Sequence, residues 1–237
     1  MAADLKSTPG AVASADAPVQ WEARSARRVV EISRDQILER SRRIVDAAYE
    51  LLESEGLEGL TIRAVLQKTG LARRAFYERF AGKDDLVLAV FEQTIHMATR
   101  VFSEQLESVG DPLQRLRLIV IAIVRGNGDL IGDGAPSNRR GAAMSREHLR
   151  LAESRPEDLQ AAISPLIQLI AQQLADGMRA GAVRTAEPQR LAALFYNLVS
   201  TTVHTELLAH ESASPDAAHR AQLADDIWEF CRRAIVA

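Results

Sequence analysis

Residues 69–85 read TGLARRAFYERFAGKDD and combine four cations with three aromatic residues around two glycines. A packed core uses aromatic residues without arginines, and a solvated face uses arginines without aromatic residues. On a helix from Ala72 to Phe80, Phe76 lies four residues before Phe80 and shares its face with Leu71, which is the spacing of a core stripe. The stretch therefore predicts a short helix that is anchored on one side and basic on the other.

The outward face of this helix carries Arg73 and Tyr77, four residues apart, and Arg74 and Glu78 at the same spacing. Arginine can read the O6 and N7 atoms of guanine in the DNA major groove, and tyrosine can donate to a phosphate. Two alternatives stay open: Arg74 and Glu78 can form an intrahelical ion pair, and Tyr77 can be the edge of the core. The pattern favours a helix that lies in a major groove.

The segments before this helix complete a larger motif. Thr61 is a helix N-cap, and Gly70 ends the same short helix because glycine adopts the positive φ of a C-terminal turn. Together with residues 72–80, this gives the spacing of a helix-turn-helix. Further upstream, Ser33 and Gln36 form a capping box at the start of a helix that ends near residue 56.

Positive charge is concentrated in one part of a slightly acidic chain. The 237 residues include 29 Lys or Arg and 32 Asp or Glu, for a net charge of -3. Residues 63–83 hold six cations and one acid, whereas residues 84–237 hold 15 cations and 20 acids. A local positive field favours a polyanionic partner at that place, although a plain solvated face would have the same charge.

The cysteine count and the length of the apolar runs narrow the class of protein further. Cys231 is the only cysteine, which excludes an intrachain disulfide and fits a reducing compartment. The longest apolar run, residues 118–124, is too short to span a bilayer, and residues 1–21 lack the apolar centre of a signal peptide. We therefore expect a cytoplasmic location.

Helical signals dominate the remainder of the chain, and no segment alternates as a strand does. The fold class is therefore predicted to be all-α. Proline and glycine breaks separate the expected helices, which cover residues 83–106, 112–124, 141–153, 156–180, 187–210 and 215–235.

The motifs taken together resemble the DNA-binding domain of the tetracycline-repressor (TetR) family over residues 39–99. The resemblance rests on three pieces in order: IVDAAYELLESEGLEGLTIRAVLQKTGL, FYERF and GKDDL. Three positions depart from the family pattern. Ala72 replaces a usual Ser or Thr, which costs roughly 1 kcal/mol of local helix stability, Leu66 replaces a common alanine, and Arg74 replaces a small residue.

The resemblance implies roles for individual residues in DNA binding. Phosphate contacts are expected from Thr61, Tyr77 and Lys83. Base contacts are expected from Arg73, Arg74, Ala75 and Arg63. Upstream of the first helix, Arg24, Arg27 and Arg28 are either a minor-groove arm or part of a solvated tail.

The resemblance also implies a helical C-terminal domain that binds a small molecule. The candidate ligand-binding residues are His148, Tyr196, Asn197 and His204. Asn197 and His204 are seven residues apart on one expected helix, so we expect them to share a face. The alternative is that each is exposed or simply hydrogen-bonded in the core.

The resemblance also implies that the last two expected helices pack against the same two helices of a second copy and form a four-helix dimer interface. Their apolar stripes are Leu191, Phe195, Leu198, Leu223, Ile227, Phe230 and Ala234, and a plain core is the other interpretation. We therefore expect three parts: a flexible arm at residues 1–32, a helix-turn-helix DNA-binding domain at residues 33–85, and a ligand-binding and dimerisation domain at residues 86–237.

The sequence does not have the residue spacing of nucleotide-binding, metal-binding or catalytic motifs. The glycines of residues 126–134 do not have the dinucleotide-binding spacing, and we interpret this segment as a mobile loop. Because the five histidines are scattered and no nucleophile motif occurs, we expect no metal, no cofactor and no enzymatic activity.

The sequence therefore predicts a DNA-binding transcriptional regulator. Two recognition helices would read a pseudopalindromic operator, and a small-molecule ligand would release a repressor from it. Two alternatives remain: a transcriptional activator of the same fold, and a helical ligand-binding or enzymatic bundle that does not bind DNA.

Overall fold

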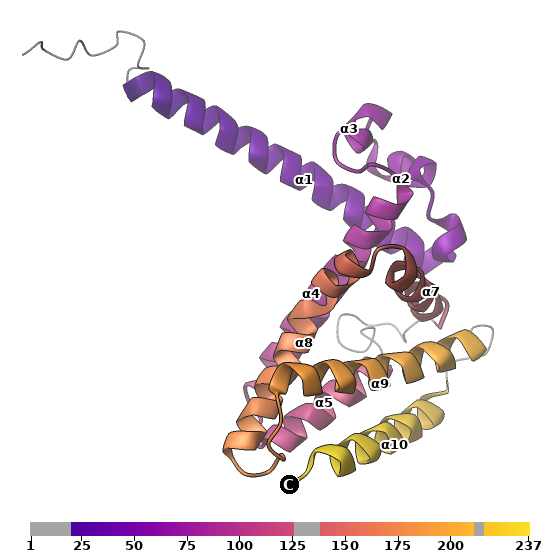
Figure 1. Ribbon diagram of the computed structural model, residues 1–237. Coiled ribbons are helices and arrows are strands. Elements are labelled where there is room, and N and C mark those ends of the chain that lie inside the picture. Colours follow the sequence, from indigo (N-terminus) through magenta and orange to yellow (C-terminus); the bar gives the residue numbers. More distant parts are fainter. Residues whose placement is uncertain (1–19, 126–137, 211–215) are drawn as a thin grey trace, which may run out of the picture. The chain divides into compact units, whose positions relative to one another are not determined.

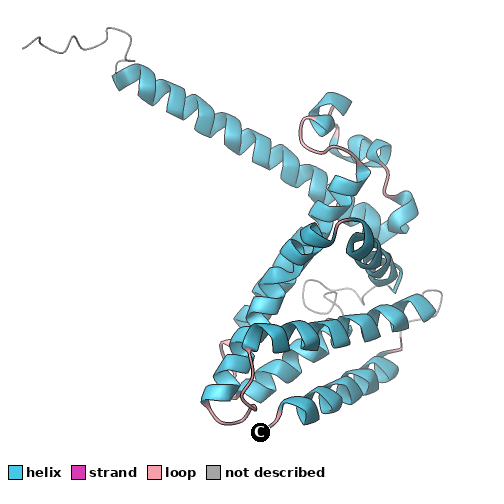
Figure 2. Ribbon diagram, viewed as in Figure 1, coloured by secondary structure: helices cyan, strands magenta, loops and turns pink. Residues whose placement is uncertain are grey.

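The computed structural model describes residues 20–125, 138–210 and 216–237, which are mostly helical (Figures 1 and 2). Within these ranges β structure is limited to an isolated antiparallel bridge between Val183 and Val236. The expected all-α class is confirmed. The loop expected at residues 126–134 lies outside the described residues.

The first helix, α1, spans Gln20–Gly59, so the N-cap predicted at Ser33 is wrong. Residues 20–42 contain neither proline nor glycine and are rich in Arg, Glu and Ala, so helix propensity carries the helix through Ser33. The part of the predicted arm from Gln20 onward is therefore helical, while residues 1–19 lie outside the described ranges. Gly56 interrupts α1 with a φ of 73°.

The chain divides into two compact units, Met1–Arg42 and Arg43–Ala237. In the described part of the first unit, the side chains of Ile37 and Leu38 are exposed.

The helix-turn-helix expected from the sequence is present. Helix α2 spans Ile62–Thr69, α3 spans Arg73–Tyr77 and α4 spans Lys83–Leu106. The Thr61 hydroxyl accepts from the Ala64 N–H at 3.1 Å, and Gly70 ends α2 with a φ of 67°. Ala72 stands at the N-cap of α3 without a side-chain hydrogen bond, as its methyl group requires.

The remaining helices follow the predicted breaks. They are α5 (Pro112–Arg125), α7 (Asn138–Ser154), α8 (Pro156–Arg179), α9 (Pro188–Ala209) and α10 (Ala217–Ile235). Helix α8 packs against α4, α5 and α9, whereas α10 packs chiefly on α5 (Figure 1). Proline opens α5, α8 and α9, where the missing N–H costs no helix hydrogen bond.

Two hydrophobic clusters hold these helices. The first lies within residues 44–90 and also includes Ala143 of α7. The predicted anchor of α3 is confirmed here, because Phe76 and Phe80 are buried and Leu71 packs against the cluster. The second cluster covers residues 88–235. Met144 of α7 packs against both, so one helix serves the two cores.

Candidate nucleic-acid interface and ligand cavity

Helix α3 is a short support for exposed cations. Arg73 and Arg74 are exposed, and Ala75 between the basic face and the core is half-buried. Thr61 and Arg63, at the start of α2, are also exposed. The predicted DNA-contacting residues of α2 and α3 are therefore accessible, apart from the partial burial of Ala75.

Both alternative interpretations of the outward face have a counterpart in the structure. Arg74 Nε donates to Glu78 Oε1 at 2.9 Å, but the Arg74 side chain is 89% exposed. A pair so exposed to water contributes little and can be exchanged for a phosphate or a base. Arg73 Nη2 donates to the Tyr77 hydroxyl at 3.4 Å, and its guanidinium lies 5.5 Å from the ring centroid.

Tyr77 combines the two roles considered for it. Its ring packs edge-on against Phe76, with the ring centroids 5.3 Å apart, while the residue remains 46% exposed. The phenol is thus held by the core and still reaches the surface beside Arg73.

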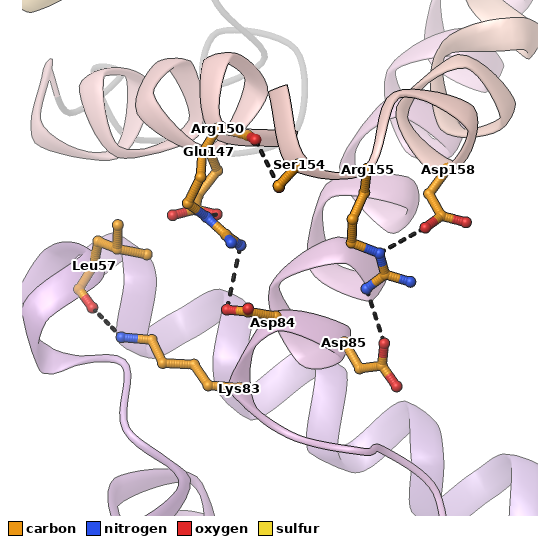
Figure 3. Close-up of polar contacts among 9 residues, drawn as sticks. All are labelled: Leu57, Lys83, Asp84, Asp85, Glu147, Arg150, Ser154, Arg155 and Asp158. Carbon is orange, nitrogen blue, oxygen red and sulfur yellow. Dashed lines mark hydrogen bonds and ion pairs between the residues drawn. The ribbon is translucent and has the colours of Figure 1, made fainter. Parts of the chain in front are cut away.

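Two cations of the basic segment differ from the sequence-based interpretation. Lys83 is half-buried, and its Nζ donates to the Leu57 carbonyl at 3.0 Å, which ties the start of α4 to the end of α1 (Figure 3). Arg79 has a side chain only 6% exposed and donates to the Ala75 carbonyl. Arg79 therefore does not belong to the exposed basic face. A phosphate contact by Lys83 stays a prediction.

Beside this face, the first turn of α4 is joined to the end of α7 by ion pairs that were not predicted (Figure 3). Arg150 Nη2 lies 3.3 Å from Asp84 Oδ1, and Arg155 Nη1 lies 2.9 Å from Asp85 Oδ1. Asp85 Oδ2 also accepts from the Ala81 N–H at 3.0 Å. This backbone bond and then the Arg155 guanidinium lower the pKa of the Asp85 carboxyl.

Helices of the second unit line a partly open cavity of about 180 Å³. Its wall is mostly apolar and is formed by α1, α4, α5, α7, α8, α9 and α10, with Phe91 and Phe102 of α4 among the aromatic residues. Three of the four predicted ligand-binding residues line it: His148, Tyr196 and His204.

The three polar rings lie close together. The ring centroids of His148 and His204 are 4.5 Å apart, and those of His148 and Tyr196 are 6.4 Å apart. Burial lowers the pKa of His148, and burial followed by the neighbouring His148 lowers the pKa of His204 to about 4. Burial raises the pKa of the Tyr196 phenol. All three groups are therefore neutral at neutral pH.

His148 has an unusual feature within this group. Its Nδ1 atom is buried and has no hydrogen-bond partner among the described residues. Leaving a buried polar nitrogen unpaired costs about 1–3 kcal/mol, so such atoms usually meet a water or a ligand.

Asn197 does not join the other predicted ligand residues, because it is exposed and lies outside the cavity wall. The cavity does extend this far along α9, because Tyr196 lines it, but a step of one residue turns the Asn197 side chain by about 100° around the helix, away from Tyr196 and toward solvent. The environment of Asn197 therefore differs from that of His204, and a ligand contact by Asn197 stays a prediction.

The apolar residues predicted as stripes on the last two helices fall into two groups, one buried and one exposed. Leu191, Phe195 and Ile227 are buried in the chain's own core. Exposed apolar side chains remain at Phe230, which is 64% exposed, and on α9 at Leu194 and Leu198. Leu194 was not singled out from the sequence, although it lies three residues after Leu191 and four before Leu198, at helical spacing.

The described residues contain neither a cluster of metal-binding side chains nor a membrane-spanning helix. No group of three or more His, Cys, Asp or Glu side chains is placed there to hold a metal ion. None of the described helices combines the length and the apolar character needed to cross a membrane.

Comparison with known proteins places this geometry in a wider group. Residues 44–90 match the family model described as bacterial regulatory proteins, tetR family. Over 183 residues the chain is 27% identical to HTH-type transcriptional repressor Rv1474c of Mycobacterium tuberculosis, covering 73% of this chain and 97% of that protein.

Solved structures agree in fold. A TetR-family transcriptional regulator from Pectobacterium atrosepticum superposes with a TM-score of 0.67 at 18% identity, covering 86% of this chain and 97% of that one. RolR in complex with resorcinol superposes with a TM-score of 0.61 at 13% identity, covering 84% of this chain and 94% of that one. At these identities the superpositions concern the fold alone.

Proposed function

The chain belongs to the tetR family of bacterial regulatory proteins and is a transcriptional regulator, and on that premise we propose that α2 and α3 bind double-stranded operator DNA. The main support for this proposal is the arrangement of side chains on α3. Buried Phe76 fixes the helix, while Arg73 and Arg74 stand exposed on its other side. Exposed arginines on a rigid support can reach base edges in a major groove.

The proposed assembly is a homodimer on a pseudopalindromic site. One five-residue helix reads few base pairs, and a second copy doubles the contacts. The proposed contact between copies is the exposed apolar face at Leu194, Leu198 and Phe230, since such side chains are costly to leave in water. Light scattering on the full chain should give twice the chain mass of 26.0 kDa.

The proposed regulation is release from DNA by a small molecule in the cavity. RolR was crystallised with resorcinol, and this chain has a mostly apolar cavity of its own that is lined by His148, whose Nδ1 atom is unpaired. A ligand weakens DNA binding about 100-fold only if it favours the non-binding conformation by roughly 2.7 kcal/mol. The protein would act in the cytoplasm as a repressor, without catalysing a reaction.

The test begins with selection of DNA by the full chain from a random pool. We expect a two-fold symmetric site to be enriched, and expect Arg73→Ala or Arg74→Ala to weaken binding to it. Arg100→Ala is a matched control, because Arg100 is exposed on α4 away from α3. Failure to enrich any DNA would contradict the proposal and favour the second candidate, a ligand-binding bundle without DNA binding, for which the cavity is the supporting feature.

The dimer contact has its own test. Phe230→Asp should give a monomer or reduce the association constant, because a carboxylate would be buried between the copies. Leu149→Asp is the control, since Leu149 is 48% exposed on α7, a helix that contributes no residue to the proposed interface. Equal behaviour of the two variants would place the dimer contact elsewhere. A reporter gene under the selected site then separates repression from activation.

A further inference from the structure

The size of the cavity limits the ligand, an inference that rests on the proposed regulation by a small molecule. A dry apolar cavity of about 150 Å³ accommodates benzene. The cavity here measures about 180 Å³ and is walled largely by aliphatic and aromatic side chains. It therefore matches a single six-membered ring with one small substituent.

The polar atoms of the wall limit the ligand further. His148 Nδ1 is buried without a partner, beside the rings of His204 and Tyr196. A neutral imidazole has one donor nitrogen and one acceptor nitrogen. Because Nδ1 is itself covered, a ligand hydroxyl reaches it only when the imidazole ring turns toward the cavity that His148 lines, and it would then satisfy an atom that the chain leaves unpaired.

The charges of the wall argue against an ionised ligand. Among the described residues that line the cavity there is no Asp or Glu, so a cation would lack a counter-charge. Arg125 and Arg220 also line it, but Arg125 is exposed to water, and Arg220 Nη1 donates to the Arg125 carbonyl at 3.4 Å. An anion buried beside the neutral histidines would lose its hydration without a comparable gain.

We propose that the cavity binds an uncharged molecule with the size of one ring, apolar except for a hydroxyl group that donates to Nδ1 of His148. Phenol, toluene and benzoate are suitable probes, because they share the ring and differ only in the substituent. Calorimetry on the full-length protein should show saturable binding of phenol, about tenfold tighter than toluene, as one neutral hydrogen bond allows. Benzoate should bind more weakly than either.

A variant separates the hydrogen bond from the shape of the cavity. His148→Leu should reduce the preference for phenol over toluene to nearly one, while toluene still binds. His96→Leu is the matched control, because His96 is exposed on α4 and does not line the cavity. The proposal is overturned if none of the probes binds, if benzoate binds most tightly, or if His148→Leu keeps the preference for phenol.

This result and the proposed function can fail separately. Operator binding is measured without any probe, and probe binding is measured without DNA. Normal operator binding with the wrong ring selectivity would overturn only the ligand class. The expected selectivity in a protein that enriches no DNA would overturn only the DNA-binding function.

A second inference rests on a different observation: Asp85 pairs with Arg155 (Figure 3) and also accepts a hydrogen bond from the backbone of Ala81. One of its oxygens accepts from the Ala81 N–H, in the loop that follows α3, and the other pairs with Arg155 between α7 and α8. The same carboxylate therefore contacts the loop after α3 and the residue that follows α7. Asp84 and Arg150 make a parallel connection one residue earlier on α4.

The two helices joined in this way also meet at the cavity. Phe91 of α4 and His148 of α7 line it, with ring centroids 5.8 Å apart. A ligand that moves α7 relative to α4 would change the distance from Arg155 to Asp85. The side chains of this pair are each about one-third exposed, and such ion pairs are weak enough to open and close.

We infer that the Asp85–Arg155 pair transmits the state of the cavity to α3. Asp85→Asn keeps an acceptor for Ala81 but removes the charge that Arg155 meets, and Arg155→Gln removes the other partner. Each should change ligand-free affinity for the selected operator about three- to tenfold. The double variant should do no more than either single one, because both remove the same interaction.

Arg100→Gln provides the control, since Arg100 makes an exposed pair with Glu104 within α4. Operator affinities that match the control, or single effects that add in the double variant, would overturn the inference. Thermal unfolding of each variant shows whether a lower affinity reflects only a less stable fold.

Discussion

The core beneath α3 and the cavity differ in the sequence separation of the residues that form them. Apart from Ala143 and Met144, the α3 core uses residues 44–90, whereas the cavity wall draws residues from Tyr49 to Arg220. Helices α2 and α3 contribute nothing to that wall. The surface that would touch DNA is thus encoded in one continuous stretch, and the cavity exists only once seven helices have packed.

The largest effect is expected where the short-range core depends on a single side chain. Phe76→Ala should lower the free energy of unfolding by about 3–5 kcal/mol, because Phe76 is fully buried beneath α3. Urea unfolding of the variant measures this. Leu149→Ala, at an exposed site, should change stability little. Similar losses for the two variants would mean that the α3 core does not depend on this ring.

The cavity should respond to pH instead. The pKa of His204 is lowered from 6.5 to about 4, so the unfolded chain takes up a proton first as the pH falls. Stability should be full above pH 6.5 and should decrease down to about pH 4, by roughly 3 kcal/mol. The neighbouring His148, Tyr49 and Tyr196 and the two arginines of the wall offer no negative charge at these pH values to offset this.

His204→Gln should lack this part of the pH dependence, which isolates it from the carboxylates that also titrate in acid. Unfolding free energies of both proteins at several pH values from 7.5 to 4, at about 25 °C, give the comparison. The control is His96→Gln, at an exposed position. Parallel curves for wild type and His204→Gln would show that the cavity histidine does not titrate in this way.

The exposed face of α3 should give a base-specific effect of intermediate size. Arg73→Ala or Arg74→Ala should cost about 1–3 kcal/mol per half-site on the selected operator if the side chain reads a guanine. The loss should nearly disappear on DNA altered at that base pair. Affinities on both duplexes decide this, and an equal loss on each would assign the arginine to the phosphates.

Lys83 should give the smallest effect and the most informative one. If its Nζ leaves the Leu57 carbonyl for a phosphate, Lys83→Ala should flatten the log–log salt dependence by about one unit per half-site. If the lysine only joins α4 to α1, the slope should stay unchanged while stability falls. Binding at several salt concentrations and urea unfolding distinguish the two roles.

The same contrast explains what could be predicted from the sequence. The anchor of α3, the Thr61 cap and the Gly70 turn depend on neighbours within a few residues, so spacing alone identified them. The start of α1 was missed because Ser33 has a capping pattern that a strong helix-forming context overrides.

At the cavity, three of the residues chosen from the sequence, His148, Tyr196 and His204, line the wall, whereas Asn197 is exposed outside it. Spacing alone could not show which side of α9 faces the cavity, because that depends on how the distant helices pack. The pairing of Asp85 with Arg155 joins residues 70 positions apart. Two acids in the first turn of a helix are well explained by the helix dipole, so nothing local indicated a distant partner.

The bond from the Ala81 N–H to Asp85 also bears on the construction of hybrid regulators. Gly82 is an obvious fusion point for exchanging the helix-turn-helix segment between two regulators, since it precedes α4. A joint there would take Ala81 from one parent and Asp85 from the other, and Arg155 would come with the second. A better transplant would be joined beyond Asp85 and would supply arginines at the end of α7, so that the transplanted α3 keeps the Ala81–Asp85 hydrogen bond together with the ion pairs to α7 and Arg155.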